Sequence, residues 1–549
     1  MNRYFAVIQK NLDEKKWLWL AIAVFFITFS LIAVWKYYNF GYNGLDLAIF
    51  NQTFYNTARG DLFGLTIHPP AYLADHFSPL ILILVIFYLP FRHPLALIFL
   101  QIAAVALTAL PIYLTGREVF SQSHVTEKFK VGWGLFFALI FLAGPFSQNF
   151  ALYEFHLLYF ALPFLFLAIY FYLKDSDVWC LIFCGLAILA REDVALVALM
   201  LGVLAIFEKR KWILGLVLIF GSISYFFSAL KIISFFNEAG GYKFFVYYSW
   251  LGSTAPEILI NILTHPILIL RRLFWGGNIA MILGMLLPFC FLPAVKPKYL
   301  ILALMPFLQI FLGSPSGSIL ILKTQYLTLF LPALFLAFIF GIKKIVWLKF
   351  FSDKKSLVIA ATICAAIYGS IIFGPFASSV YAFTKTGLVA IGTEFKNNLI
   401  KKIPAGAAVA ASYDFITKLS SRPNIYALNY FFLGKTQFGA TEYFLPENTE
   451  YLAINFSDFL TYKTSAGDNP LYRESYLSGG RRIRERIEKD GFGVVEILED
   501  LALLKKGAET DIKLFQIYDG ERPDIENTQR ASFGDINFLG FEIKPASEN

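Results

Sequence analysis

Charged side chains are scarce in this sequence of 549 residues. Asp, Glu, Lys and Arg make up only 16% of it, whereas a soluble globular protein carries about 25%. Hydrophobic residues make up 57% and aromatic residues 18%. The composition excludes an ordinary soluble enzyme, and it also excludes a disordered or collagen-like chain.

Cysteine and nucleotide-binding motifs are also lacking. The four cysteines all fall in apolar runs, and residues 380–549 contain none, so a disulfide-stabilised fold is excluded. The C-terminal part has neither a GxGxxG pattern nor a P-loop lysine, which leaves nucleotide binding without support.

The charge that is present divides the chain into two parts. Residues 380–549 hold 20 Lys or Arg and 23 Asp or Glu, while residues 1–379 hold 27 and 16. This pattern predicts a transmembrane domain at 1–379, an α/β domain at 380–510 and a β-rich extension at 511–549. The positive excess of the first part has a simple cause in basic cytoplasmic loops, so we expect no nucleic-acid partner.

Apolar runs predict about eleven transmembrane helices. They are residues 17–35, 95–115, 131–146, 157–173, 178–190, 194–207, 212–230, 276–293, 299–313, 326–341 and 356–374. The run 79–91 is short and is closed by Pro90, so we interpret it as re-entrant or interfacial. The run 17–35 lacks a small-residue cleavage site and is expected to remain as a span.

The short basic loops set the expected orientation. With the N-terminus in the cytoplasm, loops 116–130, 174–177, 208–211, 294–298 and 342–355 collect Lys and Arg on that side, as the positive-inside rule requires. The large loop 36–94 and the C-terminal domain then lie outside the cytoplasm. The sequence thus predicts a multi-pass cell-membrane protein with an extracytoplasmic C-terminal domain.

The same orientation gathers unusual polar residues on the outer face, where ionisable groups near membrane depth mark functional sites. In the segment GLDLAIFNQ, the apolar spacing predicts an amphipathic interfacial helix. Asp46 is then either the N-cap of that helix or a general base, with Gln52 hydrogen-bonding nearby.

Three polar residues of the same loop leave two interpretations open. His68, Asp75 and His76 could bind a divalent metal, although no helical ligand spacing such as HxxxH is present. Alternatively, Asp75 and His76 contact a substrate, and Asp75 is a further candidate acid. We predict no cofactor and keep a metal as the weaker alternative.

Two more outer segments carry candidate residues. Glu154 and His156 alternate in YEFH, so both could face one site. Arg191, Glu192 and Asp193 form a turn that is either a self-neutralising ion pair or a phosphate site based on Arg191. Further cations that could bind phosphate, or merely extend to the interface, are Arg59, Lys323, Arg271 and Arg272.

These segments carry a family resemblance. GLDLAIFNQ, DHFSPLILI, YEFHLLYFALPFL, ILAREDVALVALMLG and VAASYDFITKLSSRPNIYAL resemble a family of uncharacterised predicted membrane proteins of bacteria and archaea. That family is placed by similarity in the GT-C superfamily of polytopic glycosyltransferases, with the protein mannosyltransferases and the lipid A aminoarabinose transferases. The resemblance spans roughly residues 40–510.

The resemblance implies a GT-C-like fold and a polyprenyl-phosphate-linked sugar donor. It places Asp46 at the catalytic acid of the first outer loop, Glu154 at a second acid, and Arg191-Glu192 at a turn that is Lys-Gly or Lys-Glu in relatives. The adjacent Asp-Glu pair of protein mannosyltransferases and the WWDYG motif of oligosaccharyltransferases are absent. The sugar and the acceptor are not specified.

The sequence therefore favours a membrane glycosyltransferase that transfers a sugar, with inversion of the anomeric configuration, at the extracytoplasmic boundary between membrane and water. Asp46 would deprotonate the acceptor, and Arg191, with Arg59 or Lys323, would stabilise the leaving phosphate. The alternatives are a transporter or lipid flippase, which would place charges at mid-membrane within related halves, and a non-catalytic membrane scaffold.

Alternating elements support the α/β domain. We predict strands at 409–412, 425–428 and 451–456, helices at 415–419 and 481–490, and a terminal hairpin from 494–498 and 502–505. Extra strands are expected at 515–518 and in FGDINFLGFEI.

Overall fold

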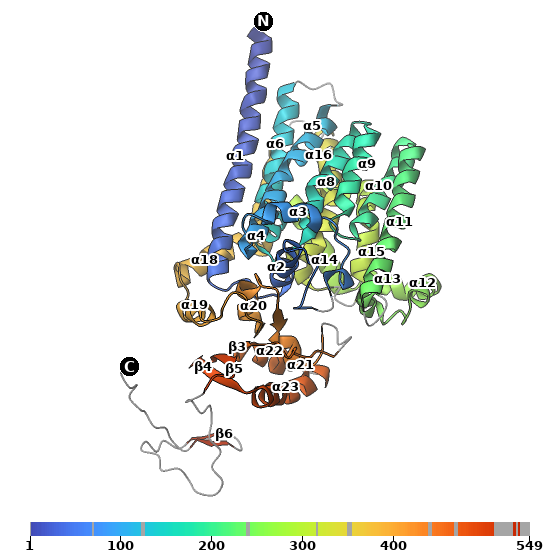
Figure 1. Cartoon of the computed structure of the whole chain (residues 1–549). Helices are drawn as coiled ribbons and strands as arrows, with labels where there is room; N and C mark the ends of the chain where they lie inside the picture. The colour runs from blue at the N-terminus through green and yellow to red at the C-terminus, as the bar shows by residue number, and fades with distance from the viewer. Residues whose placement is uncertain are drawn as a thin grey trace.

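The computed structural model describes residues 2–68, 71–121, 127–237, 242–313, 317–348, 354–436, 442–465, 470–509, 531–533 and 536–538. The N-terminal part of the chain forms a body of roughly aligned helices (Figure 1). The C-terminal part forms a smaller α/β tail beyond one end of this body.

The body is almost entirely helical. Its α-helices are α1 (Asn2–Tyr38), α2 (Asp46–Thr57), α3 (Ile81–Tyr88), α4 (Pro94–Leu107), α5 (Ala109–Ser121), α6 (Glu127–Ala143), α7 (Pro145–Leu152), α8 (Ala161–Leu173), α9 (Asp177–Ile188), α10 (Val194–Lys209), α11 (Trp212–Phe236), α12 (Ala255–Thr264), α13 (Pro266–Leu273), α14 (Gly276–Leu286), α15 (Leu304–Leu312), α16 (Leu331–Val346) and α17 (Lys355–Phe373). Its 3-10 helices are η1 (Tyr72–Ala74), η2 (Leu157–Phe160), η3 (Lys243–Tyr248), η4 (Leu287–Phe289), η5 (Leu292–Val295), η6 (Pro297–Ala303), η7 (Ile319–Lys323) and η8 (Gln325–Phe330).

Several of these helices can cross a membrane. Within the described ranges, five are long and apolar enough, namely Lys15–Tyr38, Pro94–Ser121, Trp212–Phe236, Gln325–Val346 and Lys355–Phe373. Two further pairs of consecutive helices are bent against each other by 50° and 51°, and the number of spans rises to seven if each pair crosses as one span. The first bend falls at Pro145, which lacks the N–H that would continue the helix before it. The chain is thus a multi-pass membrane protein, while the number eleven stays a prediction.

The segment expected to be re-entrant or interfacial forms a short helix. The eight residues of α3 rise about 12 Å, much less than the roughly 30 Å of a bilayer's hydrocarbon core. Helix α3 packs on α2, and Tyr88 at its end donates a hydrogen bond from its hydroxyl to the Asn51 Oδ1 atom at 2.8 Å. This short length agrees with the expectation that residues 79–91 do not cross the membrane.

The tail contains a five-stranded sheet in the order β2-β1-β3-β5-β4. Its elements are α18 (Phe376–Thr386), α19 (Thr393–Lys401), β1 (Val409–Ala411), α20 (Tyr413–Leu419), β2 (Ile425–Ala427), α21 (Leu428–Leu433), β3 (Tyr451–Asn455), α22 (Ser457–Ser465), α23 (Pro470–Asp490), β4 (Phe492–Leu498) and β5 (Leu501–Lys506). The strand β1 runs parallel to both β2 and β3, with Val409 opposite Ile425 and Tyr451. The strand β5 runs antiparallel to β3 and β4.

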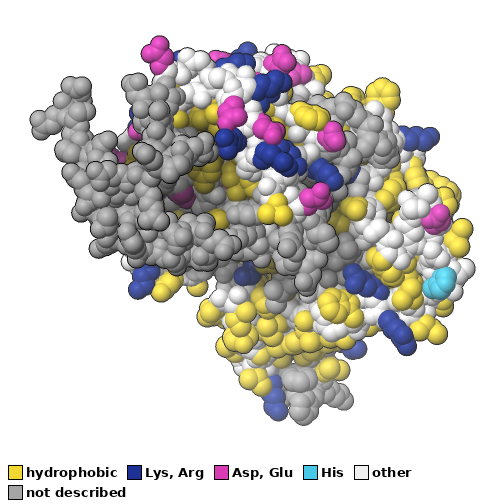
Figure 2. Space-filling model, turned by 90° about the horizontal axis from the view of Figure 1, so that it is seen from below, with side chains coloured by type: hydrophobic (Ala, Val, Ile, Leu, Met, Phe, Trp, Pro, Cys, Tyr) yellow, Lys and Arg dark blue, Asp and Glu magenta, His cyan; other side chains and the backbone are white. Residues whose placement is uncertain are grey.

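The predicted elements of the tail are confirmed with small shifts in their ends. The largest shift is at α23, which begins at Pro470 rather than at 481. The strand expected at 515–518 lies outside the described residues. Part of the final motif forms β6 (Ala531–Phe533) and β7 (Ile536–Phe538), which pair antiparallel. Seen from the tail side, charged side chains of both signs gather toward one edge of the molecule, and hydrophobic side chains dominate the opposite edge (Figure 2).

The tail packs directly on α2. The Asn51 side chain donates to the Ser420 and Ser421 hydroxyls at 2.8 and 3.0 Å, and the Gln52 amide donates to the Pro423 carbonyl at 2.8 Å. Ten of the twelve residues of α2 are buried. The predicted helix is therefore present, but its polar residues Asn51 and Gln52 contact the tail and do not face water.

We expect the contact between α2 and the tail to stabilise the whole chain. Asn51→Ala would leave the buried Tyr88 and Ser420 hydroxyls without this partner, which typically costs about 1–3 kcal/mol. The thermal unfolding midpoint of the detergent-purified protein should fall accordingly. Ser378→Ala, at an exposed hydroxyl of α18, is the matched control, and an equal change in both variants would contradict the inference.

A second prediction concerns a carboxyl group at the edge of the tail sheet. Burial, and then the nearby Asp414 carboxylate, raise the pKa of Asp458 to about 6. A raised carboxyl pKa means that its contribution to stability is full below about pH 4 and is lost as the pH rises through about 6. Asp458→Asn should therefore stabilise the tail by up to about 2 kcal/mol at pH 7.5, with no gain near pH 4, in thermal unfolding scans across that range. A gain that is independent of pH would contradict it.

Candidate functional site

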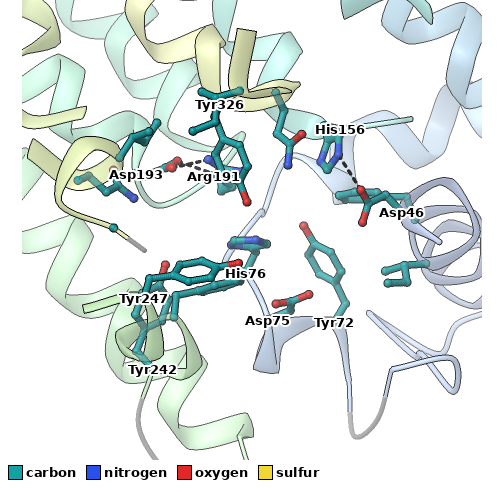
Figure 3. Close-up of a pocket in the computed structure, with 18 of the residues that line it drawn as sticks. Asp46, Tyr72, Asp75, His76, His156, Arg191, Asp193, Tyr242, Tyr247 and Tyr326 are labelled. Atoms are coloured by element: carbon teal, nitrogen blue, oxygen red, sulfur yellow. Dashed lines mark hydrogen bonds and ion pairs between the residues drawn. The ribbon is translucent and has the colours of Figure 1, made fainter. Parts of the chain in front are cut away.

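A cavity of about 150 Å³ lies where the first long loop, within residues 36–94, meets η3 and η8 (Figure 3). Its polar lining residues are Asp46, Asp75, His76, His156, Arg191, Asp193, Gln309 and Gln325. Aromatic side chains form much of the remaining wall, namely Phe50, Tyr72, Tyr242, Phe244, Tyr247, Tyr248 and Tyr326. The cavity thus has apolar and aromatic walls with a few convergent polar groups, which is the usual character of a small-molecule site.

Asp46 is the most exposed carboxylate among these groups. It is the first residue of α2, and its Oδ2 atom lies 3.2 Å from the Nε2 atom of His156, toward which it points in Figure 3. Its side chain is 41% exposed, whereas that of His156 is 9% exposed. The preceding Leu45 has a φ of 85°, a left-handed conformation that is uncommon for leucine and that starts the helix at Asp46.

Asp46 is the first helical residue of α2 and not its N-cap, which is Leu45. Glu154 satisfies the helix start instead. Its two carboxylate oxygens accept hydrogen bonds from the Gly44 N–H at 3.1 Å and the Leu47 N–H at 2.9 Å. A Cβ atom on Gly44 would lie 3.1 Å from the Glu154 side chain, so the glycine permits this close approach.

Glu154 therefore supports the site without lining it. Burial raises the pKa of its carboxyl group, and the Lys36 ammonium partly offsets that rise. It is not among the residues that line the cavity, in contrast to the expectation of a second acid facing the substrate. The contact joins residues more than a hundred positions apart, which no local pattern could reveal.

His156 is held by packing and by its backbone. Its ring stacks on Tyr153 at 5.8 Å and meets Phe50 edge-on at 5.6 Å, and its N–H donates to the Gln101 Oε1 atom at 2.9 Å. Burial lowers the pKa of His156, although the Asp46 carboxylate acts in the opposite direction. In the tautomer that carries its hydrogen on Nε2, the imidazole can donate a hydrogen bond to Asp46.

A buried lysine accompanies Asp75. The Lys243 ammonium forms an ion pair with the Asp75 carboxylate and lies 3.1 Å from the Nε2 atom of His68. Burial opposes ionisation of Asp75, but Lys243, His76 and His68 outweigh it and lower the pKa of that carboxyl group. Burial and the adjacent Lys243 lower the pKa of His68 to about 4.

This arrangement bears on the metal interpretation. The ammonium of Lys243 lies between two of the three residues proposed as ligands, and His76 turns toward Glu192 instead. Across the described ranges, no three His, Cys, Asp or Glu side chains converge in a way that could hold a metal ion. The residues present therefore do not fit a metal site.

Glu192 positions His76. It is almost fully buried, and its carboxylate lies 2.8 Å from the Nδ1 atom of His76 and accepts from the Phe77 N–H at 3.1 Å. The His76 ring stacks on Phe244 with 5.1 Å between centroids. Glu192 thus acts on the cavity through His76 and not by lining it.

Arg191 and Asp193 form a two-pronged ion pair in the cavity wall. The Nε atom of Arg191 donates to Oδ1 of Asp193 at 2.8 Å, and Nη2 donates to Oδ2. Both side chains are buried, and burial works against the charge of Arg191, but Asp193 outweighs it and raises the guanidinium pKa. The ion-pair interpretation of this turn is confirmed, and the pair still faces the cavity.

Three predicted residues lie away from the cavity. Gln52 is buried and its amide is fully used, because it donates to the Thr66 hydroxyl and the Pro423 carbonyl and accepts from the Thr66 and Ile67 N–H groups. Arg59 is exposed next to the Tyr55 ring, and Lys323 is exposed at the end of η7. Arg59 and Lys323 were chosen only because the predicted topology puts them on the same face as the other candidates. Lying on one face does not place a side chain near the cavity.

Lys243 and the tyrosines of the cavity were not predicted. They come from the aromatic segment YKFFVYY at 242–248, from Tyr72 and from Tyr326, and such residues are common in any membrane protein. Only their meeting with Asp75 and Arg191 gives them a possible function.

The chain was compared with known proteins. A family model described as "Predicted membrane protein (DUF2079)" matches residues 36–484. No curated protein matches the chain significantly. Similar solved structures are those of ArnT from Cupriavidus metallidurans bound to undecaprenyl phosphate and in the apo state. Both are 14% identical to this chain, with TM-scores of 0.49 and 0.48, and both alignments cover 89% of this chain and 98% of the other.

Proposed function

The chain belongs to the DUF2079 family of predicted membrane proteins, and we propose that it is a membrane glycosyltransferase that uses a polyprenyl-phosphate-linked sugar. The observation that carries the proposal is the cavity itself, which has an exposed carboxylate, Asp46, and a buried guanidinium, Arg191, in its wall. The donor class rests on the resemblance of the sequence motifs to GT-C enzymes.

In the proposed reaction, the acceptor hydroxyl gives its proton to Asp46 as its oxygen attacks the anomeric carbon of the sugar. The bond between that carbon and the phosphate oxygen breaks, and the polyprenyl phosphate leaves with the electron pair. A single displacement of this kind inverts the anomeric configuration. A positioned general base contributes about 10²–10⁴-fold to such a step.

The other polar groups have distinct tasks in this scheme. His156 orients the Asp46 carboxylate, since the two are 3.2 Å apart. Arg191 uses Nε and Nη2 for Asp193, which leaves Nη1 as a donor for the leaving phosphate. The tyrosine-rich wall offers ring faces and hydroxyl groups to the sugar.

Binding of polyprenyl phosphate tests the role of Arg191. Asp193→Asn should bind it as well as the wild type or better, because a competing carboxylate is removed and Arg191 stays charged. The double variant Arg191→Gln with Asp193→Asn should bind about 10–100-fold more weakly, since a charged hydrogen bond is worth about 1.5–3 kcal/mol. Titration calorimetry of the purified proteins gives the dissociation constants.

The double variant removes both charges of the buried pair, and in Asp193→Asn the amide oxygen can still accept a hydrogen bond from Arg191. Thermal unfolding of both proteins checks that each is folded before the titration. Equal affinities of the two variants would remove Arg191 from phosphate binding.

A further inference from the structure

A second and larger cavity lies at the end of α1 that is farther from the N-terminus. Its volume is about 1040 Å³, and its lining residues come from α1, α18, α19 and the loop between the last two. The ribbon shows α18 and α19 near this end of α1 (Figure 1). None of its lining residues belongs to the cavity around Asp46. We name it the α1–α18–α19 groove.

Two of its walls are apolar and each is one face of a helix. From α1 come Leu31, Ile32 and Trp35, and from α18 come Phe376, Val380 and Phe383. Leu31 and Ile32 lie four and three residues before Trp35, and Val380 lies four residues after Phe376 and three before Phe383, so each set shares one side of its helix. Because α1 is one of the helices able to cross a membrane, this part of the groove meets the acyl region of a bilayer.

The third wall is polar. Helix α19 contributes Glu394, Asn397, Asn398 and Lys401, again on one face. Glu394 and Lys401 are separated by two helical turns, or about 10 Å, and neither has an ion-pair partner elsewhere in the described ranges. The groove thus runs from an apolar region to an end that carries one acidic and one basic group.

The groove is closed by hydrogen bonds, so it is a built feature and not a gap between loosely packed helices. The Trp35 indole donates to the Gly387 carbonyl at 3.0 Å, and the Asn39 amide donates to the Leu388 carbonyl at 3.0 Å. The Oδ1 atom of Asn39 accepts from the Ala390 N–H at 2.7 Å. These contacts fasten the loop between α18 and α19 to the end of α1.

We propose that this groove binds one zwitterionic aminophospholipid of the surrounding membrane. Its acyl chains lie along α1 and α18, its phosphate meets Lys401, and its ammonium meets Glu394. The occupant is inferred from charge complementarity, because a headgroup with one positive and one negative charge matches the one acidic and one basic side chain. This lipid site is independent of the proposed transfer reaction.

Native mass spectrometry of the delipidated full-length protein can test the proposal. The probes are dioleoylphosphatidylethanolamine, dioleoylphosphatidylglycerol and dioleoylglycerol, which share acyl chains and differ in headgroup charge. We expect phosphatidylethanolamine to bind most tightly and dioleoylglycerol at least about tenfold more weakly. Equal binding of the three lipids, or tighter binding of phosphatidylglycerol, would overturn the proposal.

Substitutions test whether phosphatidylethanolamine binds in the α1–α18–α19 groove. Lys401→Gln should weaken phosphatidylethanolamine binding by about tenfold or more, while Lys385→Gln, at a lysine of α18 outside the groove, should leave it unchanged. Val380→Trp should abolish binding by filling the apolar part. The same loss in Lys385→Gln, no loss in Val380→Trp, or displacement of the phospholipid by undecaprenyl phosphate would contradict the assignment.

Discussion

Replacing Asp46 with asparagine is expected to lower sugar transfer by about 10²–10⁴-fold while the protein stays folded. The amide keeps the size of the side chain and can still hydrogen-bond to His156, but it cannot accept a proton from the acceptor. Because Glu154, and not Asp46, accepts the hydrogen bonds of the N–H groups at the start of α2, the change should leave α2 intact. Initial rates with a radiolabelled polyprenyl-phosphate sugar and a membrane extract as the source of acceptor give the measurement.

The matched control is Asp61→Asn, which changes an exposed carboxylate that is near Asp46 in the sequence but does not line the cavity. It should retain the wild-type rate, and both variants should unfold at the wild-type temperature. A wild-type rate for Asp46→Asn would exclude Asp46 as the base. A comparable loss in Asp61→Asn would show that the effect is not specific to the cavity.

Lys243→Ala should destabilise the protein by about 3–5 kcal/mol, because it leaves the Asp75 carboxylate buried without its cation. The two side chains are 8% and 13% exposed, so water replaces the lost partner only poorly. The double variant Lys243→Met with Asp75→Asn removes both charges and should regain most of the loss. Thermal unfolding in detergent, followed by intrinsic tryptophan fluorescence, compares the three proteins.

Lys323→Ala, at an exposed lysine outside the cavity, serves as the control and should change stability by less than about 0.5 kcal/mol. A double variant as unstable as Lys243→Ala would mean that the lysine stabilises the fold through its packing and not through Asp75.

That these candidate residues share one face could be predicted from the sequence, and with it much of the cavity. Asp46, Asp75, His76, His156 and Arg191 come from separate segments, yet the counting of basic loops placed all of them on one side, and the structure brings them to one cavity. Charge patterns predict which loops share a membrane side because short loops rich in Lys and Arg stay in the cytoplasm.

Contacts within that face could not be predicted. Glu154 meets the start of α2 across 107 residues, and Lys243 reaches His68 across 175. Such pairs depend on how helices pack and on where loops return, and neither leaves a periodic signal in the sequence. This is also why Gln52 and Arg59 were placed at a site that they do not reach.

Some features of the fold could likewise be predicted from the sequence, and others could not. The strands of the tail were predictable because apolar β-branched runs alternate with turn residues over short distances. The burial of α2 was not, because its polar residues Asn51 and Gln52 look like a solvated face until the tail supplies their partners at Ser420 and Pro423. A polar helix face in a membrane protein can therefore be an interface with another domain.

The most direct test of the proposed function is the release of free polyprenyl phosphate from a polyprenyl-phosphate sugar by the purified protein. With a membrane extract as the source of acceptor, the wild type should release one polyprenyl phosphate for each sugar transferred, and the product should have the inverted anomeric configuration. Asp46→Asn should release about 10²–10⁴-fold less. Equal release by the wild type and Asp46→Asn, or transfer with retained configuration, would contradict the account.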